Sequence, residues 1–422
     1  MDNPKDINSR PKEIIAIFFT NDEKYAVPGT PIALQTSFDS DNLNDTIKTL
    51  LKSTDIEINL DSIDFEFLIN QKLLLVSLEE FLEKENLNAE AQINIQYFVK
   101  RDSPKPHKAF LLDDWISSID TIDDWAVIGC YDSTAHICDL RNGEHKIIIP
   151  AHSSSIKAVS WLPKKTSNGF SFVTCAHDET SMLWDWNCET NQIDHIATFI
   201  GHARSVDCVD VHQDMIATGS YDHHLKIWPA INSLNIASDP SKSPTSKLRS
   251  PIITLEGHKE AITGCVWMRD RSNSSVATVS IDSNLKIWDV EIGESVQSFS
   301  STKAFLDIAY CSSKGLFLTS SCDHFVRLWD PRETQGPLVK QSFNNSYSNN
   351  AWISCVKWSP NDDNLFVTGS YDFKVNLWDM RSSTTPLYEL LGHQDKIMDV
   401  CWSTKNFIVS GGADCHLKIF KT

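Results

Sequence analysis

The chain has 422 residues, of which 41% are hydrophobic and 22% are charged, and its formal net charge is −18. The composition is ordinary for a globular protein, and the length allows one large domain with a small one, or about three average domains. The first 100 residues contain 18 Asp and Glu but only 9 Lys and Arg, so half of the negative excess lies there. Because phosphate binding needs a basic face, the acidity argues against free nucleic acid as a direct ligand and favours basic or metal-bearing partners for this end.

Membrane insertion and secretion are not expected. The N-terminal sequence MDNPKDINSRPK has no apolar core, and no stretch approaches the about 18 apolar residues that a spanning helix needs. The 11 cysteines are scattered from Cys130 to Cys415 without a CxxC pair, which is typical of buried thiols in a reducing compartment. We therefore expect no disulfide framework, no metal bound by this chain alone and no cofactor.

The first hundred residues alternate between strand and helix patterns. We expect strands at 13–20, 25–34, 65–70 and 91–99 and helices at 42–54 and 77–87. Asp41 is the expected N-cap of the first helix, and Ser77 with Glu80 three residues later forms a capping-box pattern for the second. This order of elements predicts an α+β ubiquitin-like domain at residues 11–100.

A short connection follows this domain. It has no Gly-Gly, so conjugation to another protein is not expected. Residues 101–107 contain two prolines and are expected to form a semi-rigid linker. A strand at 108–112, KAFLL, is expected directly afterwards.

A repeat occupies the remainder of the chain. An Asp is followed six residues later by Trp or a substitute seven times, at Asp132/Cys138, Asp178/Trp184, Asp222/Trp228, Asp282/Trp288, Asp323/Trp329, Asp372/Trp378 and Asp414/Phe420. Ser or Thr stands four residues before the Asp in six copies, and a His after a small residue precedes four of them. This register identifies WD40 repeats and predicts an all-β, seven-bladed propeller at residues 108–422.

The resemblance to WD40 repeats implies that the His, Ser or Thr, Asp and Trp of a complete copy form one hydrogen-bonded tetrad. Such pairing would avoid the cost of buried polar groups without partners, about 1–3 kcal/mol each. The complete tetrads are His152, Thr174, Asp178 and Trp184; His202, Thr218, Asp222 and Trp228; and His258, Thr278, Asp282 and Trp288. Copy 7 has His393, Ser410 and Asp414 but Phe420 for Trp, copies 5 and 6 lack His, and copy 1 lacks His, Thr and Trp. Blades 1, 5 and 6 are therefore expected to depend mainly on apolar packing.

For the histidines this structural role outweighs metal binding. The turn Asp residues lie one per blade around a ring, so they are too dispersed to converge as catalytic acids and bases. Tyr131, Tyr221 and Tyr371 each precede a turn Asp and are candidate interface anchors, although a Tyr at this position can simply pack.

Two further features concern the edges of the propeller. The chain ends at 417–422, which corresponds to the third strand of the last blade, so strand 108–112 is expected to supply the fourth, close the ring and remove a sheet edge. The longest gap between repeats contains residues 231–250, which are rich in Ser, Pro and Asn and are expected to form a flexible rim insertion.

The head segment FEFLINQKLLLVSLEEFLEKENLNAEAQINIQY (65–97) and the insertion ending LRSPIITLEGH (248–258), combined with the WD repeats, resemble the family of WD repeat-containing protein twelve over nearly the whole chain. The Notchless family has a similar head but eight blades. The resemblance implies a non-catalytic scaffold in 60S ribosomal subunit biogenesis and pre-rRNA processing, located in the nucleus, in both nucleolus and nucleoplasm.

The resemblance also implies partners. The propeller would bind the block-of-proliferation protein, which joins pescadillo in a trimer on pre-60S ribonucleoprotein particles. Midasin, an AAA ATPase that removes the trimer, would grip the head, and a Glu of the head would complete the metal coordination of the midasin adhesion site. By motif this residue is Glu90, with Glu83 and Glu85 as possible substitutes. The chemistry is reasonable because Mg²⁺ prefers oxygen ligands.

Two other function classes remain open. Ubiquitin-like heads can dock on proteasomes and propellers can bind degrons, so the chain could be a ubiquitin-pathway adaptor or substrate receptor. That function would need exposed Leu, Ile and Val together on the sheet of the head. The other class, a hydrolase built on the propeller, is disfavoured because the sequence has no P-loop, GxSxG or HExxH motif.

Overall fold

The computed structural model describes residues 13–53, 60, 62–87, 92–166, 169–230, 247–269, 274–333, 339–344 and 351–422. The chain forms two compact units, a head within residues 1–102 and a second unit that begins at residue 103. The predicted fold class is confirmed, because one mixed sheet with two helices forms the head and seven further sheets form a propeller. Among the described residues, no helix has the length and apolar character needed to cross a membrane.

The head is a five-stranded sheet in the order β2-β1-β5-β3-β4, with β1 and β5 parallel at its centre. Its strands are β1 (Glu13–Phe19), β2 (Ile32–Gln35), β3 (Phe65–Ile69), β4 (Lys72–Leu73) and β5 (Ile93–Val99). Its helices are the 3₁₀ turn η1 (Glu23–Tyr25), α1 (Ser40–Ser53) and α2 (Leu78–Lys84).

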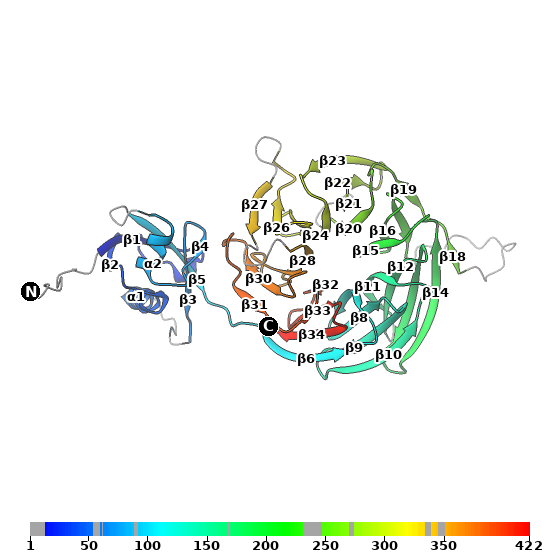
Figure 1. Cartoon of the computed structure of the whole chain (residues 1–422), viewed down its shortest axis with the longest axis horizontal. Coiled ribbons are helices and arrows are strands. Elements are labelled where there is room, and N and C mark those ends of the chain that lie inside the picture. The colour runs from blue at the N-terminus through cyan, green and yellow to red at the C-terminus, as the bar shows by residue number, and fades with distance from the viewer. Residues whose placement is uncertain are drawn as a thin grey trace, which may run out of the picture. The chain divides into compact units, whose positions relative to one another are not determined.

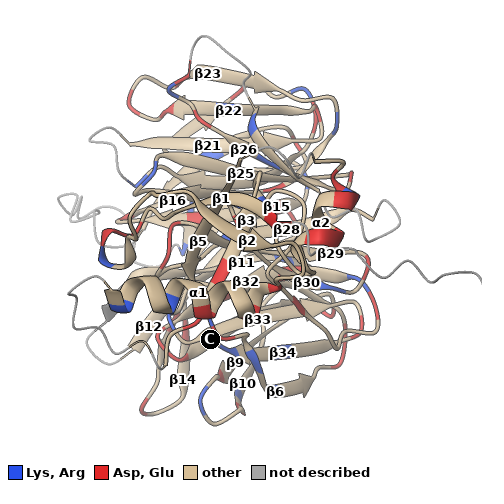
Figure 2. Ribbon diagram, turned by 90° about the vertical axis from the view of Figure 1, so that its left-hand side faces the viewer, with Lys and Arg blue, Asp and Glu red and all other residues tan. Residues whose placement is uncertain are grey.

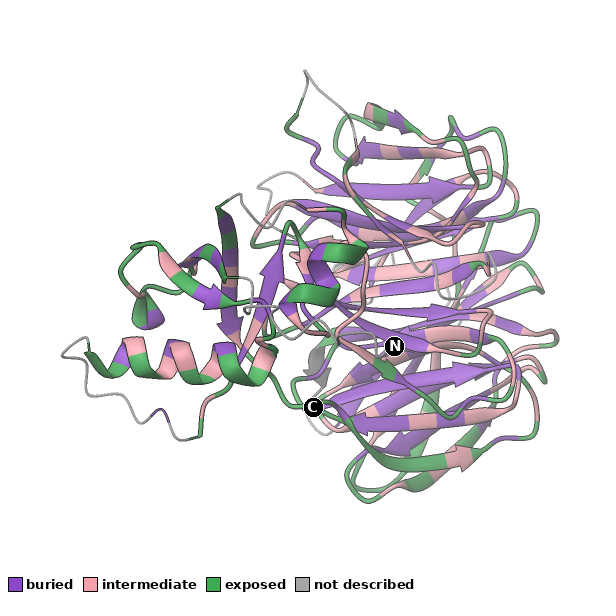
Figure 3. Ribbon diagram, turned by 60° about the vertical axis from the view of Figure 1, so that its left-hand side comes forward, coloured by how far each residue is buried: buried purple, intermediate pink, exposed green. Residues whose placement is uncertain are grey.

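The core of the head forms between the sheet and one face of α1. Leu43, Ile47 and Leu51 recur at helical spacing and are buried, so α1 presents an apolar stripe to the sheet. Figure 3 shows this alternation of buried and exposed residues along α1. Tyr97 lies in the same core, and its hydroxyl donates a hydrogen bond to the Tyr25 carbonyl at 2.5 Å, which satisfies its only polar group.

Two local predictions for the head were wrong. The second strand is β2 alone, four residues long instead of the expected 25–34, because η1 occupies the start of this stretch and Pro28 and Pro31 lack the N–H that a strand ladder uses. The N-cap of α1 is Asp39 and not Asp41, since Asp39 Oδ1 accepts from the Asn42 N–H at 3.0 Å while Asp41 lies inside the helix.

The second helix cap was predicted correctly, because Ser77 accepts from the Glu80 N–H at 3.4 Å. The predicted strands 13–20, 65–70 and 91–99 correspond to β1, β3 and β5 within two residues at each end.

The propeller consists of seven sheets around a ring (Figure 1). Blade 1 contains β7 (Ile116–Ile122), β8 (Trp125–Cys130), β9 (Thr134–Asp139) and β10 (Glu144–Pro150). Blade 2 contains β11 (Ile156–Thr166), β12 (Gly169–Ala176), β13 (Thr180–Asn187), β14 (Gln192–Ile200) and β18 (Leu248–Arg249). Blade 3 contains β15 (Val206–His212), β16 (Met215–Ser220), β17 (Leu225–Pro229) and β19 (Ile253–Leu255).

The other four sheets follow the same order. Blade 4 contains β20 (Ile262–Trp267), β21 (Ser275–Ser280), β22 (Asn284–Asp289) and β23 (Glu294–Ser300). Blade 5 contains β24 (Phe305–Cys311), β25 (Leu316–Ser321), β26 (Phe325–Trp329) and β27 (Val339–Asn344). Blade 6 contains β28 (Ile353–Trp358), β29 (Leu365–Ser370), β30 (Val375–Asp379) and β31 (Tyr388–Leu390). Blade 7 contains β32 (Ile397–Cys401), β33 (Phe407–Gly412), β34 (His416–Lys421) and β6 (Lys105–Leu111).

The ring closes through β6, which pairs antiparallel with the last strand, β34. The strand starts at Lys105 instead of 108 and ends at Leu111, so residues 105–107 of the expected linker belong to the propeller. Pro106 is tolerated within β6 because the strand lies at the edge of its sheet and needs no donor on its outer side.

The rim insertion is described only in part. Residues 231–246 of the expected loop 231–250 lie outside the described residues. Its last part is not a loop, because Leu248 and Arg249 form β18 and add a fifth, parallel strand to blade 2. Sequence composition could not reveal this two-residue strand, since its pairing partner β14 lies about fifty positions earlier.

The hydrophobic core of the propeller lies between neighbouring blades. Each second strand, such as β16, is buried along nearly its full length, and Figure 3 shows the central strands as continuous buried bands. Blades 7 and 1 share one cluster that includes Phe407, Leu417, Ile119 and Ile128. The closing strand therefore completes a core that neither end of the chain could form alone.

Candidate functional site

The structure brings the four residues of each expected complete tetrad together. In blade 3, His202 Nδ1 lies 2.8 Å from Asp222 Oδ2, and His202 Nε2 lies 2.8 Å from Thr218 Oγ1. Trp228 Nε1 donates to the same Thr218 oxygen at 2.8 Å. The tetrads of blades 2 and 4 have the same connections, through His152, Thr174, Asp178 and Trp184 and through His258, Thr278, Asp282 and Trp288.

The direction of these hydrogen bonds follows from their members. The Trp228 indole can only donate, so Thr218 Oγ1 accepts from it and donates its own proton to His202 Nε2. The other ring nitrogen, Nδ1, then carries the proton and donates to the Asp222 carboxylate. Each tetrad is therefore a saturated chain from indole to carboxylate.

The electrostatics agree with this assignment. Burial lowers the pKa of His202, so its imidazole is neutral near pH 7. Burial alone would raise the pKa of Asp222, but hydrogen bonds from His202 and from the Ala203 N–H outweigh it and hold that pKa below its usual range. An ionised carboxylate that is fully engaged in this way stabilises the blade and has no free oxygen for a reacting group.

Blade 7 keeps three of the four members. His393 Nδ1 lies 3.0 Å from Asp414 Oδ2, and Nε2 lies 2.8 Å from Ser410 Oγ. Phe420 occupies the Trp position and is buried. Its ring cannot donate a hydrogen bond, so the series of hydrogen bonds in this blade ends at Ser410.

Blades 5 and 6 retain more polar contact than expected. Trp329 donates to Thr319 at 2.8 Å and Trp378 donates to Thr368 at 3.0 Å. In blade 5, Arg327 forms an ion pair with Asp323 at 2.6 Å, which adds a polar contact to a blade whose apolar residues are also buried. That apolar packing mainly holds this blade stays a prediction. Arg327 follows the turn Asp in the sequence. A repeat pattern that places a His before the turn therefore could not reveal the role of Arg327.

Blade 6 leaves its turn Asp less well satisfied. Asp372 Oδ1 accepts from the Lys374 N–H at 3.1 Å, whereas Asp372 Oδ2 is buried without a hydrogen-bond partner among the described residues. Within the part of the chain that the structure describes, blade 6 is thus the blade in which the tetrad is shortened without an equivalent replacement.

Blade 1 has replaced its tetrad. Ile128 and Cys138 stand at the Thr and Trp positions and are fully buried in an apolar cluster. Asp132 Oδ1 instead accepts from the Thr134 hydroxyl at 2.6 Å, and Thr134 Oγ1 also lies 2.8 Å from His136 Nε2. Sequence spacing identified Asp132 but gave no role to His136.

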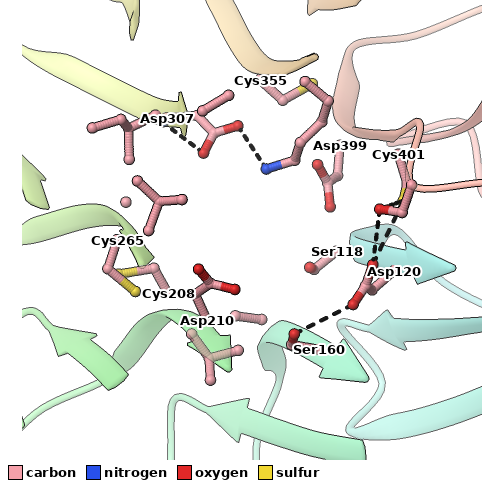
Figure 4. Close-up of a pocket in the computed structure, with 18 of the residues that line it drawn as sticks. Ser118, Asp120, Ser160, Cys208, Asp210, Cys265, Asp307, Cys355, Asp399 and Cys401 are labelled. Atoms are coloured by element: carbon pink, nitrogen blue, oxygen red, sulfur yellow. Dashed lines mark hydrogen bonds and ion pairs between the residues drawn. The ribbon is translucent and has the colours of Figure 1, made fainter. Parts of the chain in front are cut away.

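The first strands of the blades surround a central channel with a cavity of about 730 Å³. Figure 4 shows four Asp side chains from different blades around this space. Each carboxylate accepts a backbone N–H of the next blade, at Trp161, Trp267, Val356 and Ile119 for Asp120, Asp210, Asp307 and Asp399 respectively, with distances of 2.7–3.0 Å. These residues tie neighbouring blades together.

Burial raises the pKa of Asp399 to about 6, although the nearby Lys357 lowers it. Lys357 Nζ lies 3.2 Å from Asp307 Oδ2 and balances part of the acidity of the channel. Sequence reasoning missed these four Asp residues because it followed the turns, although each lies in the first strand of its repeat.

One face of the propeller gathers aromatic side chains. In every blade, the residue before the turn Asp donates its N–H to the residue that precedes the first strand. These seven residues, called the turn ring here, are Tyr131, His177, Tyr221, Ile281, Cys322, Tyr371 and Ala413. Shared backbone bonding places them at equivalent positions around one face.

Two aromatic pairs stand out on this face. Trp115 and Tyr131 have ring centroids 5.7 Å apart, and Lys157 Nζ lies 4.2 Å from the Tyr131 ring. Trp352 and Tyr371 stack at 5.7 Å. Both tryptophans are nearly half exposed, at 47% and 46%, so they offer large apolar surface at a polar rim.

Glu90, the expected ligand of a partner's metal, lies outside the described residues. Of its two possible substitutes, Glu85 forms an ion pair with Lys72, whereas Glu83 is exposed. Glu79 and Glu80 are also exposed on α2, and Figure 2 shows the acidic residues of this helix. The helix that leads toward Glu90 thus adds negative charge on the solvent side of the head.

Protein-family models match both units. The NLE (NUC135) domain matches residues 14–82. The WD domain, G-beta repeat, matches six segments at 143–185, 193–229, 249–289, 293–330, 341–379 and 384–421. The matches begin after the turn of blade 1, in agreement with the loss of its tetrad residues.

Full-length relatives are similar along nearly the whole chain. The ribosome biogenesis protein WDR12 homolog of Ixodes scapularis is 40% identical over 97% of this chain and 98% of its own length. The homologs of Aedes aegypti and Drosophila mojavensis are 34% and 37% identical, each over 96% of this chain and 94% of their own length.

Proposed function

Because the chain belongs to the family of ribosome biogenesis protein WDR12, we propose that it is a non-catalytic scaffold in the assembly of the 60S ribosomal subunit, in the nucleolus and nucleoplasm. The observation that carries this proposal is the similarity over 97% of the chain, which includes both the head and the propeller. A protein that keeps both units keeps two surfaces, and joining partners requires at least two.

The head is proposed to be the part of the chain that binds the midasin ATPase. Glu90 would supply one carboxylate oxygen to a Mg²⁺ ion held by the partner, and the ion would make the contact depend on metal. The acidic surface of α2 supports this assignment, since it favours approach to a positively charged metal site.

The propeller is proposed to bind the block-of-proliferation protein, with pescadillo in the same complex on pre-60S particles. The turn ring, together with the two tryptophans that contact its tyrosines, is the surface that supports this proposal best. Exposed Trp and Tyr residues contribute large contact area at low entropic cost, and they dominate many protein interfaces. Trp115 and Trp352 are the proposed anchors.

A scaffold role also suits the polar groups of the propeller. The carboxylates of the complete tetrads and of the channel all accept hydrogen bonds from their own chain. Their chemistry is thereby used for holding the blades, which leaves surface contact as the means of action.

Sedimentation of cell extracts tests the proposal. The full chain should migrate with pre-60S particles, and its depletion should deplete mature 60S subunits relative to 40S subunits. Migration with proteasomes and unchanged 60S levels would overturn the proposal.

Binding to midasin tests the role of Glu90. The tagged full chain should retain the midasin adhesion domain in Mg²⁺ but not in EDTA, and Glu90→Ala should abolish retention. Asp45→Ala is the matched control, because it removes an exposed acidic group from α1 of the same head, away from the acidic surface of α2, and should leave retention unchanged. Retention by Glu90→Ala equal to wild type would contradict this assignment.

The alternative function, a ubiquitin-pathway adaptor, has one supporting observation. Ile15 and Phe19 of β1 are 51% and 43% exposed and lie on the same side of the strand, as residues at an even spacing do. Ile15→Ser with Phe19→Ser would abolish proteasome association if this surface were a docking patch, and would leave pre-60S association intact.

A further inference from the structure

Blade 1 has lost the tetrad but gathers a different set of polar groups at its turn. Cys130 ends β8, Asp132 lies in the turn and His136 lies on β9, and their ligand atoms are all within 4.8 Å of one another. We propose that these three residues bind a zinc ion. The sequence concealed this site because its C-x-D-x₃-H spacing matches no familiar zinc motif.

The three side chains have the chemistry that zinc selects. Thiolate sulfur, imidazole nitrogen and carboxylate oxygen bind Zn²⁺ at about 2.0–2.3 Å in tetrahedral geometry, which places ligand atoms roughly 3.3–3.8 Å apart. The three ligand atoms now lie within 4.8 Å of one another, so shifts of about 1 Å in their positions suffice to reach the tetrahedral distances. Three protein ligands leave the fourth position to water.

The Thr134 hydroxyl lies between two of the proposed ligands, where a cation would bind. Thr134 Oγ1 lies 2.6 Å from Asp132 Oδ1 and 2.8 Å from His136 Nε2. The carboxylate and the imidazole nitrogen therefore converge on one point. A metal ion between them would replace two hydrogen bonds with two stronger bonds and release the threonine hydroxyl to rotate.

His136 also has the support that metal-binding histidines need. Its other ring nitrogen, Nδ1, lies 2.8 Å from His145 Nε2 on β10, so His145 fixes the ring plane and leaves Nε2 to the Thr134 hydroxyl, which also contacts Asp132. Such outer partners orient ligands and raise their basicity. His145 is therefore a positioning residue of the proposed site.

The three proposed ligands differ in their exposure to solvent. Cys130 and His136 are buried at 0% and 2% exposure, whereas Asp132 is exposed. The buried pair provides a site shielded from bulk water, and the exposed carboxylate provides the entry side. Bound metal would hold the turn against β9 and thereby replace the missing tetrad in the blade next to the ring closure.

Cobalt substitution tests the proposal on the reduced, full-length protein. Wild type, after chelator treatment and desalting, should bind one equivalent of Co²⁺ with a thiolate-to-cobalt absorption band, and Zn²⁺ should displace it. Cys130→Ser should lose the band, while Cys138→Ala, which removes a buried thiol of the same blade outside the ligand set, should keep it.

Affinity measurements complete the test without depending on a buried substitution. Asp132→Asn changes an exposed side chain and should weaken Zn²⁺ binding in a chelator competition. His145→Gln should weaken it by about 10–100-fold, as loss of an outer partner does. Absence of a stoichiometric metal in wild type, or a band that persists in Cys130→Ser, would overturn the proposal and leave Asp132, Thr134, His136 and His145 as a purely hydrogen-bonded relay.

Discussion

Blade 3 and blade 6 have the same four-strand sheet but different polar groups inside it. In blade 3 the hydrogen-bonded chain runs from Trp228 through Thr218 and His202 to Asp222. Among the described residues of blade 6, it consists of Trp378 and Thr368. Because both sheets form, the blade geometry comes from strand pattern and apolar packing, while the tetrad adds stability and fixes the loop before the first strand to the turn.

The largest expected difference between these blades comes from removing the threonine hydroxyl. Thr218→Val leaves the Trp228 indole N–H and His202 Nε2 without partners and should lower the free energy of unfolding by about 2–4 kcal/mol. Among the described residues, Thr368→Val leaves the Trp378 N–H unpaired and no second group, and it should cost about 1–2 kcal/mol. Denaturant titration measures both, and equal losses would show that the longer chain contributes nothing.

Blade 5 offers an intermediate case, in which Arg327 replaces the histidine. Arg327→Met removes the ion pair with Asp323 but keeps the apolar stem, and should cost about 1–3 kcal/mol because both charged groups are largely buried. A double-mutant cycle with Asp323→Asn isolates the pair. A coupling energy near zero would return blade 5 to the apolar category that the sequence suggested.

The two blades should also differ in how pH affects their contribution to stability, because blade 3 contains a buried histidine, His202. Burial lowers the pKa of His202, so the unfolded state binds a proton more readily than the native state. The contribution of His202 is present above the unfolded value of about 6.5 and is lost as pH falls through that value toward the folded pKa. His202→Gln should therefore lose less stability than wild type between pH 7 and 5, and an identical slope would contradict this account.

The smallest effect on stability is expected on the turn ring. Tyr221 is 45% exposed, so Tyr221→Ala should change the free energy of unfolding by no more than about 0.5 kcal/mol. Calorimetry of the purified protein tests this. A loss comparable to that of Thr218→Val would mean that the ring is part of the core and is not a free surface.

Sequence spacing predicted the propeller because every repeat encodes the same strands and turns, and His202, Thr218, Asp222 and Trp228 lie at fixed distances along the chain. It could not reveal β18 or the early start of β6, because both depend on pairing between distant segments. It also missed Asp399 and Arg327, since their roles depend on which neighbour a side chain reaches.

Head and propeller are proposed to bind different partners through separable contacts. Affinity purification of the full chain, as wild type, Glu90→Ala and the pair Trp115→Ala with Trp352→Ala, tests it most directly. Glu90→Ala should lose midasin and keep the block-of-proliferation protein, and the double tryptophan variant should do the reverse. Loss of both partners from either variant, or of neither, would contradict a scaffold with two independent contacts.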